Sequence, residues 1–331
     1  MPGQSPGTPA TPVPRLASVV GRISLEAIAE ASELIDPVFR DTPQFVSEPL
    51  SELLGATVVL KVETLNPIRS FKGRGTDYLL HRIEPPPAGL VCASAGNFGQ
   101  GLAYACRKRG VRVTVFAAEN ATSLKVQRMR ALGAEVVLRG KDFDAAKEHA
   151  RAHAAATNAM FVEDGQVAAI AEGAGTIALE LCRMAEPLDV VLVPLGDGAL
   201  VSGIGAWMKR AMPSVRVVGV VASGAPAMQL SWRAGRVVTT ESMSTIADGI
   251  AVRAPVPEAL EDMKGTVDDV VAVDDDEIRA AMRLLFSHAG LAAEAAGAAG
   301  LAAVKHTPGM RAAVIVTGGN LSDEQMRALL P

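Results

Sequence analysis

Lys72 is the residue whose sequence context most clearly indicates covalent chemistry. It lies in the segment 66–75, after a strand-like run ending at Glu63 and before a helix-like run. A lysine that forms an imine needs a fixed position and access to its neutral form. Desolvation beside Phe71, or a cationic neighbour such as Arg74, would favour that neutral form. The sequence therefore makes Lys72 a candidate nucleophile, and an ordinary surface lysine is the alternative.

Two glycine-containing turns, each between a predicted strand and a predicted helix, could bind anions. The first covers 94–101 and the second covers 196–200. The free N–H groups and positive dipole end of a helix attract carboxylates and phosphates. Asn97 adds an amide that can hydrogen-bond a phenolic or carbonyl oxygen. Either turn could instead be an ordinary loop whose glycines satisfy its backbone angles.

The second turn does not match the common nucleotide-binding motifs. A dinucleotide fingerprint would require glycine at Val201, and a P-loop would require lysine and a hydroxyl residue at Ile204 and Gly205. A phosphate monoester remains as a suitable ligand. A further strand-like run ends at Thr317, and ligands of open α/β sheets bind beyond the carboxyl ends of strands.

The elements that must position these residues alternate between strand-like and helix-like segments. This alternation predicts mainly parallel sheets with helices on both faces. The chain of 331 residues is long enough for two lobes. We expect a disordered tail over 1–18, a large domain formed by 19–88 with 163–331, and a small domain over 89–162.

Composition excludes some functions and locations. The net charge of −4 gives no reason to expect nucleic-acid binding. Cys92, Cys106 and Cys182 lack metal or redox spacing and suggest reduced thiols of a cytoplasmic protein. The alanine-rich run 289–304 is interrupted by Glu294, which argues against a membrane span. Glu294 could be a structural acid or a neighbour of the active site, and we favour the structural role. We expect no metal site.

Taken in order, these segments resemble the fold-type II family of pyridoxal-phosphate-dependent enzymes. The serine/threonine dehydratase and serine racemase subgroup is the most similar. The resemblance runs from about Ser24 to about Leu330 and rests mainly on 66–72 and 94–97, with further matches at 123–134, 172–180 and 245–253. It implies a tryptophan synthase β-like α/β fold, with two open, mainly parallel sheets and the cofactor between the lobes.

The resemblance also implies roles for individual residues. Lys72 matches the Schiff-base lysine, Asn97 the contact to the cofactor's 3-hydroxyl, and Thr317 the partner of the pyridine nitrogen. A neutral hydroxyl at that nitrogen moderates the electron sink and favours elimination. The implied carboxylate-binding residues are Ser94, Ala95, Asn97 and Phe98; the implied cofactor-binding residues are Phe71, Lys72, Asn97, Gly196, Asp197, Gly198, Ala199, Leu200 and Thr317.

Six positions depart from the family pattern. Asp197 replaces a glycine of the phosphate loop, and we expect its carboxylate to point away as a solvent-screened charge. Phe98 replaces a frequent histidine and makes the substrate side more apolar. Ala95 stands where the racemase has serine, so racemisation should be minor. Ile68 and Arg69 replace the usual Thr-Gly, so we expect a changed cofactor entrance. Val221 replaces an acidic ligand of metal-activated relatives.

The implied activity is dehydration and deamination of L-threonine, L-serine or both to a 2-oxo acid and ammonia. We expect a homodimer without a regulatory domain, a small-molecule amino-acid substrate, and no membrane or nucleic-acid partner. Three alternatives remain: a β-replacing synthase or other lyase of the same fold, a non-catalytic pyridoxal-phosphate-binding regulator, and an unrelated sugar-phosphate or nucleotide binder.

Overall fold

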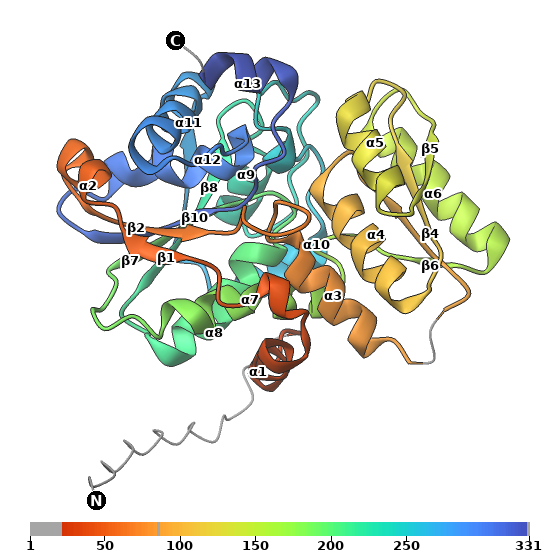
Figure 1. The fold of residues 1–331 in the computed structure, drawn as a ribbon, viewed down its shortest axis with the longest axis horizontal. Coiled ribbons are helices and arrows are strands. Elements are labelled where there is room, and N and C mark those ends of the chain that lie inside the picture. Colours follow the sequence, from red (N-terminus) through yellow and green to blue (C-terminus); the bar gives the residue numbers. More distant parts are fainter. Residues whose placement is uncertain (1–21, 85–86, 330–331) are drawn as a thin grey trace, which may run out of the picture.

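The computed structural model describes residues 22–84 and 87–329. The predicted tail over 1–18 lies outside these residues. Two β-sheets organise the described chain, one of six strands and one of four. Figure 1 shows the four-stranded sheet and its helices on the right, beside the larger sheet and its helices.

The larger sheet is parallel except at one edge. Its order is β1-β2-β10-β7-β8-β9, and only β1 pairs antiparallel, with β2. The strands are β1 (Gln44–Val46), β2 (Thr57–Val62), β7 (Val190–Pro194), β8 (Arg216–Ala222), β9 (Asp269–Val273) and β10 (Arg311–Val316). Strands β2, β7 and β10 are almost continuously apolar and buried, as expected for parallel strands covered on both faces.

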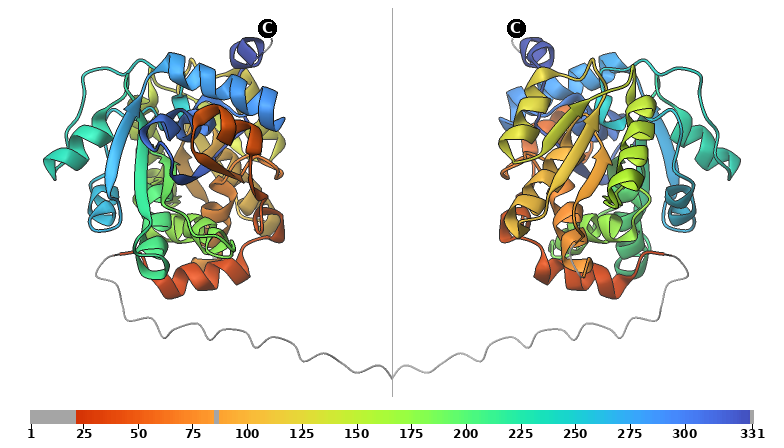
Figure 2. Two further views of the ribbon diagram at one scale, coloured as in Figure 1. Left: turned by 90° about the vertical axis from the view of Figure 1, so that its left-hand side faces the viewer. Right: turned by 90° about the vertical axis from the view of Figure 1, so that its right-hand side faces the viewer.

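Successive side chains of these strands enter two different cores. Val190 and Leu192 pack with helices on one face, whereas Val191 and Val193 pack with helices on the other. One helical layer comprises α2 (Glu48–Leu54), α11 (Asp275–Ala289), α12 (Ala295–Ala302) and α13 (Asp323–Leu329). On the opposite face, α7 (Ala168–Leu181) and α8 (Ala199–Ala211) cover the sheet, and α1 (Leu25–Leu34) and α3 (Lys72–Arg82) pack against α7. Figures 1 and 2 show both layers.

The smaller sheet is wholly parallel, in the order β5-β4-β3-β6. Its strands are β3 (Leu90–Ala93), β4 (Val113–Ala117), β5 (Glu135–Leu138) and β6 (Met160–Phe161), and its helices are α4 (Asn97–Arg109), α5 (Ser123–Ala131) and α6 (Phe143–Thr157). All of them fall within the segment predicted as the small domain. The proposed boundaries at 89 and 162 stay a prediction.

Shorter elements complete the described chain. They are η1 (Pro37–Phe39), α9 (Ala227–Ala234), η2 (Asp248–Ile250), α10 (Pro257–Met263) and η3 (Ala303–His306). The alanine-rich run forms α12 and η3 inside the core. Among the residues that the structure describes, no helix is long and apolar enough to cross a bilayer. The predicted α/β class with two open sheets is confirmed, and antiparallel β1 makes the larger sheet mixed.

Candidate active site

The beginnings of three helices meet at one cavity of about 630 Å³. Lys72 is the first residue of α3, Asn97 the first of α4 and Ala199 the first of α8. Each helix presents its positive dipole end and unbonded N–H groups there. The cavity wall contains every residue that the sequence analysis assigned to cofactor or substrate: Phe71, Lys72, Ser94, Ala95, Asn97, Phe98, Gly196, Asp197, Gly198, Ala199, Leu200 and Thr317. Their individual roles remain predictions.

The Lys72 amine reaches into this cavity and donates a hydrogen bond to the carboxylate of Asp164. Its Nζ lies 4.7 Å from the ring centroid of Phe71 and 5.9 Å from that of Phe98. Both rings are buried, so the amine sits between apolar surfaces and one carboxylate. Asp164 was not anticipated, because it lies 92 residues away in the sequence.

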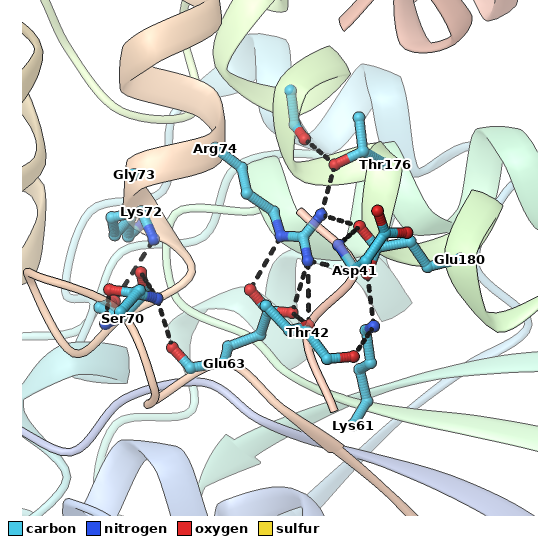
Figure 3. Close-up of polar contacts among 12 residues, drawn as sticks. Asp41, Thr42, Lys61, Glu63, Ser70, Lys72, Gly73, Arg74, Thr176 and Glu180 are labelled. Carbon is cyan, nitrogen blue, oxygen red and sulfur yellow. Dashed lines mark hydrogen bonds and ion pairs between the residues drawn. The ribbon is translucent and has the colours of Figure 1, made fainter. Parts of the chain in front are cut away.

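The expectation that Arg74 is a cationic neighbour of the Lys72 amine is wrong. Arg74 is fully buried and extends away from Lys72 into a separate ion-pair cluster (Figure 3). Its guanidinium donates to Glu63 and Glu180 over 2.6–3.0 Å. Two glutamates therefore compensate its charge, and the helical turn that carries Lys72 is anchored to β2 and α7.

The same cluster holds Glu180 in its ionised form. Lys61 of β2 donates over 2.5 Å to Glu180 Oε2, the oxygen that also accepts from Arg74 Nη2 (Figure 3). Burial alone would raise the pKa of Glu180, but hydrogen bonds and charge from Arg74 and Lys61 lower that pKa to about 2. The two cations and two anions of this cluster are thus mutually neutralised inside the core.

The turn before α4 is shaped by the hydroxyl of Ser94. Its Oγ accepts hydrogen bonds from the N–H groups of Gly96 and Gly99, at 3.1 and 3.0 Å. This fixes the loop that the sequence assigned to carboxylate binding. Ala95 lies in the cavity wall with no hydroxyl or acidic group.

Asn97 is oriented by two side chains that the sequence analysis did not assign to the site. Its Nδ2 donates to Glu294 Oε1 over 2.5 Å, and its Oδ1 accepts from Asn320 Nδ2 over 2.7 Å. Glu294 is buried and lines the cavity, so it is more than a structural acid. Burial raises the pKa of Glu294. The alanine-rich flanks of Glu294 gave no indication of this position.

The turn before α8 carries an unexpected carboxyl group. Gly198 adopts φ +93°, a conformation that side chains rarely tolerate, and α8 begins directly after it. Asp197 is half-buried in the cavity wall. Burial raises the pKa of Asp197 to about 7, and the negative charge of Asp164 contributes to the same shift. Asp197 is therefore not an exposed surface charge, while the expectation that its carboxylate points away from the phosphate stays a prediction.

Thr317 follows β10 and is also buried in the cavity wall. Its carbonyl oxygen accepts a hydrogen bond from the Phe71 N–H at 3.0 Å, and the next residue, Gly318, forms an antiparallel bridge with Ser70. These backbone contacts hold the end of β10 against the Lys72 turn. Thr317 and Lys72 therefore line the cavity from adjacent segments.

Two ion pairs join the four-stranded lobe to the segment 248–253 beside the cavity. Lys125 of α5 pairs with Asp248, and Asp144 of α6 pairs with Arg253. All four residues line the cavity. The matched segments 123–134 and 245–253 are thus brought together across the site.

The residue expected to replace an acidic metal ligand, Val221, lies in an apolar setting. Val221 lies within β8 and is completely buried. Across residues 22–84 and 87–329, no group of three or more histidine, cysteine, aspartate or glutamate side chains is arranged to hold a metal ion. Cys92 and Cys106 are buried free thiols, and burial raises the pKa of each.

Comparison with known proteins gives a consistent result. The sequence profile of the family described as "Pyridoxal-phosphate dependent enzyme" matches residues 35–318. The chain is 38% identical to the L-threonine ammonia-lyase of Thermotoga maritima, over 90% of this chain and 76% of that protein. It is 33% identical to a biosynthetic L-threonine dehydratase of Pasteurella multocida, over 90% of this chain and 60% of that protein.

The fold agrees with the sequence match. The crystal structure of the T.th. threonine deaminase superposes with a TM-score of 0.85 and 33% sequence identity, covering 90% of this chain and 99% of that one. The resemblance drawn from the sequence motifs is thereby confirmed.

Proposed function

The chain belongs to the family of pyridoxal-phosphate-dependent enzymes, and we propose that it dehydrates and deaminates a β-hydroxy amino acid, L-threonine or L-serine. The observation that carries the proposal is that the Lys72 amine and two candidate anion-binding turns line the same cavity. One turn suits the cofactor phosphate, and the other suits the substrate carboxylate. Such an arrangement can place an amino acid beside a basic amine.

The donor groups of the cavity fit pyridoxal phosphate. Lys72 offers a primary amine for the aldehyde, Asn97 an amide for the phenolic oxygen, and Thr317 a hydroxyl for the ring nitrogen. The turn of Gly198 and the start of α8 offer backbone N–H groups for the phosphate. Asp197 is the exception, and its raised pKa lets it be neutral beside an anion.

When bound, pyridoxal phosphate supplies an aldehyde and an electron-accepting ring that stabilises negative charge on the substrate's Cα. The protein's contribution is position and proton transfer. Backbone N–H groups of the 94–98 loop, held by Ser94, bind the substrate carboxylate. The Lys72 amine removes the α-proton, because its Nζ lies in the cavity wall beside the rings of Phe71 and Phe98. Glu294 and Asn320 keep the Asn97 amide in one orientation.

The apolar wall supports threonine as the better substrate. The Phe98 ring is buried and lies beside the Lys72 amine, so it can contact a β-methyl group. Serine would be dehydrated less efficiently, because it lacks that methyl. We further propose a cytoplasmic homodimer; the three free cysteines suit a reducing compartment.

The direct experiment is to incubate the pyridoxal-phosphate-loaded protein with L-threonine and L-serine and to measure 2-oxo acid and ammonia. We expect both products in equal amounts and no requirement for a second nucleophile. Product formation only when sulfide is added would instead assign a β-replacing synthase. Cofactor binding without turnover of either amino acid would assign a non-catalytic binding protein.

A further inference from the structure

Two carboxyl groups at the reacting end of the cavity are not explained by cofactor or carboxylate binding. Asp164 accepts the hydrogen bond of the Lys72 amine, and Asp197 projects from the facing loop before α8. Both line the cavity. A phosphate-binding turn gains nothing from added negative charge, so these acids need another role.

The two loops that carry these acids are in close contact. Gly165 has φ +79°, and a Cβ there would lie 2.2 Å from the Asp197 carbonyl oxygen and 3.3 Å from the Asp197 Cβ. The Gly165 N–H donates to Asp164 Oδ1 over 3.1 Å. This hydrogen bond steadies the carboxylate, while its other oxygen faces the amine.

The charges around Asp197 come from both loops and from neighbouring helices. Asp164 and Glu163 add negative charge, and Lys72 and Lys147 add positive charge. Lys147 and Glu163 form an ion pair with each other over 2.9 Å. Of these five charged groups, Lys72, Asp164 and Asp197 are not held by that ion pair.

Several other ionisable groups of the wall are already engaged. Lys125 pairs with Asp248, Arg253 with Asp144, and Glu294 with Asn97. Dehydration needs an acid, because hydroxide is a poor leaving group until it is protonated. Within the described residues, Asp164 is the acid that contacts the catalytic amine.

We propose that Asp164 is a catalytic residue that passes the α-proton from Lys72 to the departing β-hydroxyl, with Asp197 as its neighbouring carboxyl group. This inference rests on the proposed dehydration. The Cα–H bond breaks, and its proton goes to the Lys72 amine. The resulting ammonium protonates the Asp164 carboxylate. Asp164 then protonates the β-oxygen, which leaves as water with the electron pair of the C–O bond. The electron pair of the broken Cα–H bond forms the new double bond between Cα and Cβ, and Asp164 is again ionised.

The test compares leaving groups that do and do not need a proton. The variants Asp164→Asn and Asp164→Ser are assayed on L-serine and on β-chloro-L-alanine, whose chloride departs without protonation. The matched control is Glu163→Gln, which removes a neighbouring carboxylate that binds Lys147 and Arg151. Cofactor dissociation constants are measured separately, and all assays use saturating pyridoxal phosphate.

We expect Asp164→Asn to lower kcat/KM for L-serine by about 10²–10⁴-fold, the usual contribution of a general acid. Chloride elimination should fall less than about ten-fold, whereas Glu163→Gln should affect both substrates by the same factor. Exchange of the α-hydrogen of L-serine with D₂O should continue in Asp164→Asn, because Lys72 is intact.

Equal losses on both substrates in both Asp164 variants would overturn the proton-transfer role. So would loss of α-hydrogen exchange in Asp164→Asn at full cofactor occupancy. These results differ from failure of the proposed function. In that case the wild-type protein would release chloride from β-chloro-L-alanine yet dehydrate neither L-serine nor L-threonine, and the inference would fall with it.

Discussion

Replacing Arg74 by methionine should destabilise the protein strongly, because Arg74 neutralises two buried carboxylates. Its side chain is 0% exposed, as is that of Glu63, while Glu180 is 6% exposed. After the substitution, Lys61 alone would face both glutamates. Breaking a buried ion pair by removing one partner costs about 3–5 kcal/mol, and we expect a loss of that size in the free energy of unfolding.

The assay is urea denaturation of Arg74→Met, Glu63→Gln and the double variant. Glu63→Gln removes one of the two carboxylates that lose their Arg74 partner in Arg74→Met, so the double variant should be more stable than the sum of the single losses predicts. Coupled buried pairs typically show interaction energies of about 0.5–3 kcal/mol. Arg74→Lys is the control that retains charge but not the hydrogen-bonding fork, and it should lose less stability than Arg74→Met.

The dependence of stability on acid pH should reveal the contribution of the same ion-pair cluster. The pKa of Glu180 is lowered from 4.5 to about 2 in the folded protein. Its stabilising contribution is therefore complete above pH 4.5 and is lost as the pH falls toward 2. This loss should be smaller in Arg74→Met, which lacks the main partner. Additive effects of Arg74→Met and Glu63→Gln, or a cost below about 1 kcal/mol for Arg74→Met, would refute the reasoning.

Three further outcomes are expected. L-Serine should keep its optical purity during turnover because Ala95 offers no proton, and Ala95→Ser should increase racemisation; chiral chromatography tests both. Activity should survive EDTA because Val221 supplies no metal ligand; a loss restored by magnesium would contradict this. The preference for L-threonine over L-serine should be a few-fold to ten-fold, since a buried methyl contributes about 1 kcal/mol. Phe98→His should reduce that kcat/KM ratio, and equal ratios in both proteins would refute the apolar-pocket argument.

The parts of the site that the sequence revealed are those encoded in contiguous turns. Lys72, Asn97 and Gly198 each stand at a strand-to-helix turn, so local spacing is enough to identify them. The alternation of apolar strands and helices likewise predicted two open sheets. These features depend on neighbours within a few residues.

The parts that the sequence did not reveal depend on distant packing. Asp164 meets Lys72 across 92 residues, and Glu294 meets Asn97 across 197. Arg74 lies two positions from Lys72 in the sequence, yet its helix directs it into the core. Proximity along the chain therefore suggested the wrong neighbour for the amine, and only the fold identifies Asp164.

The central claim is that Lys72 is the residue that binds the cofactor covalently and acts as the base. Borohydride reduction of the pyridoxal-phosphate-loaded protein, followed by peptide mapping, tests it most directly. The account predicts a pyridoxyl group on Lys72 of the wild-type protein. The Lys72→Ala variant should carry no pyridoxyl group and should produce no 2-oxo acid. A pyridoxyl group on Lys61 or Lys125 of the wild-type protein would contradict the account.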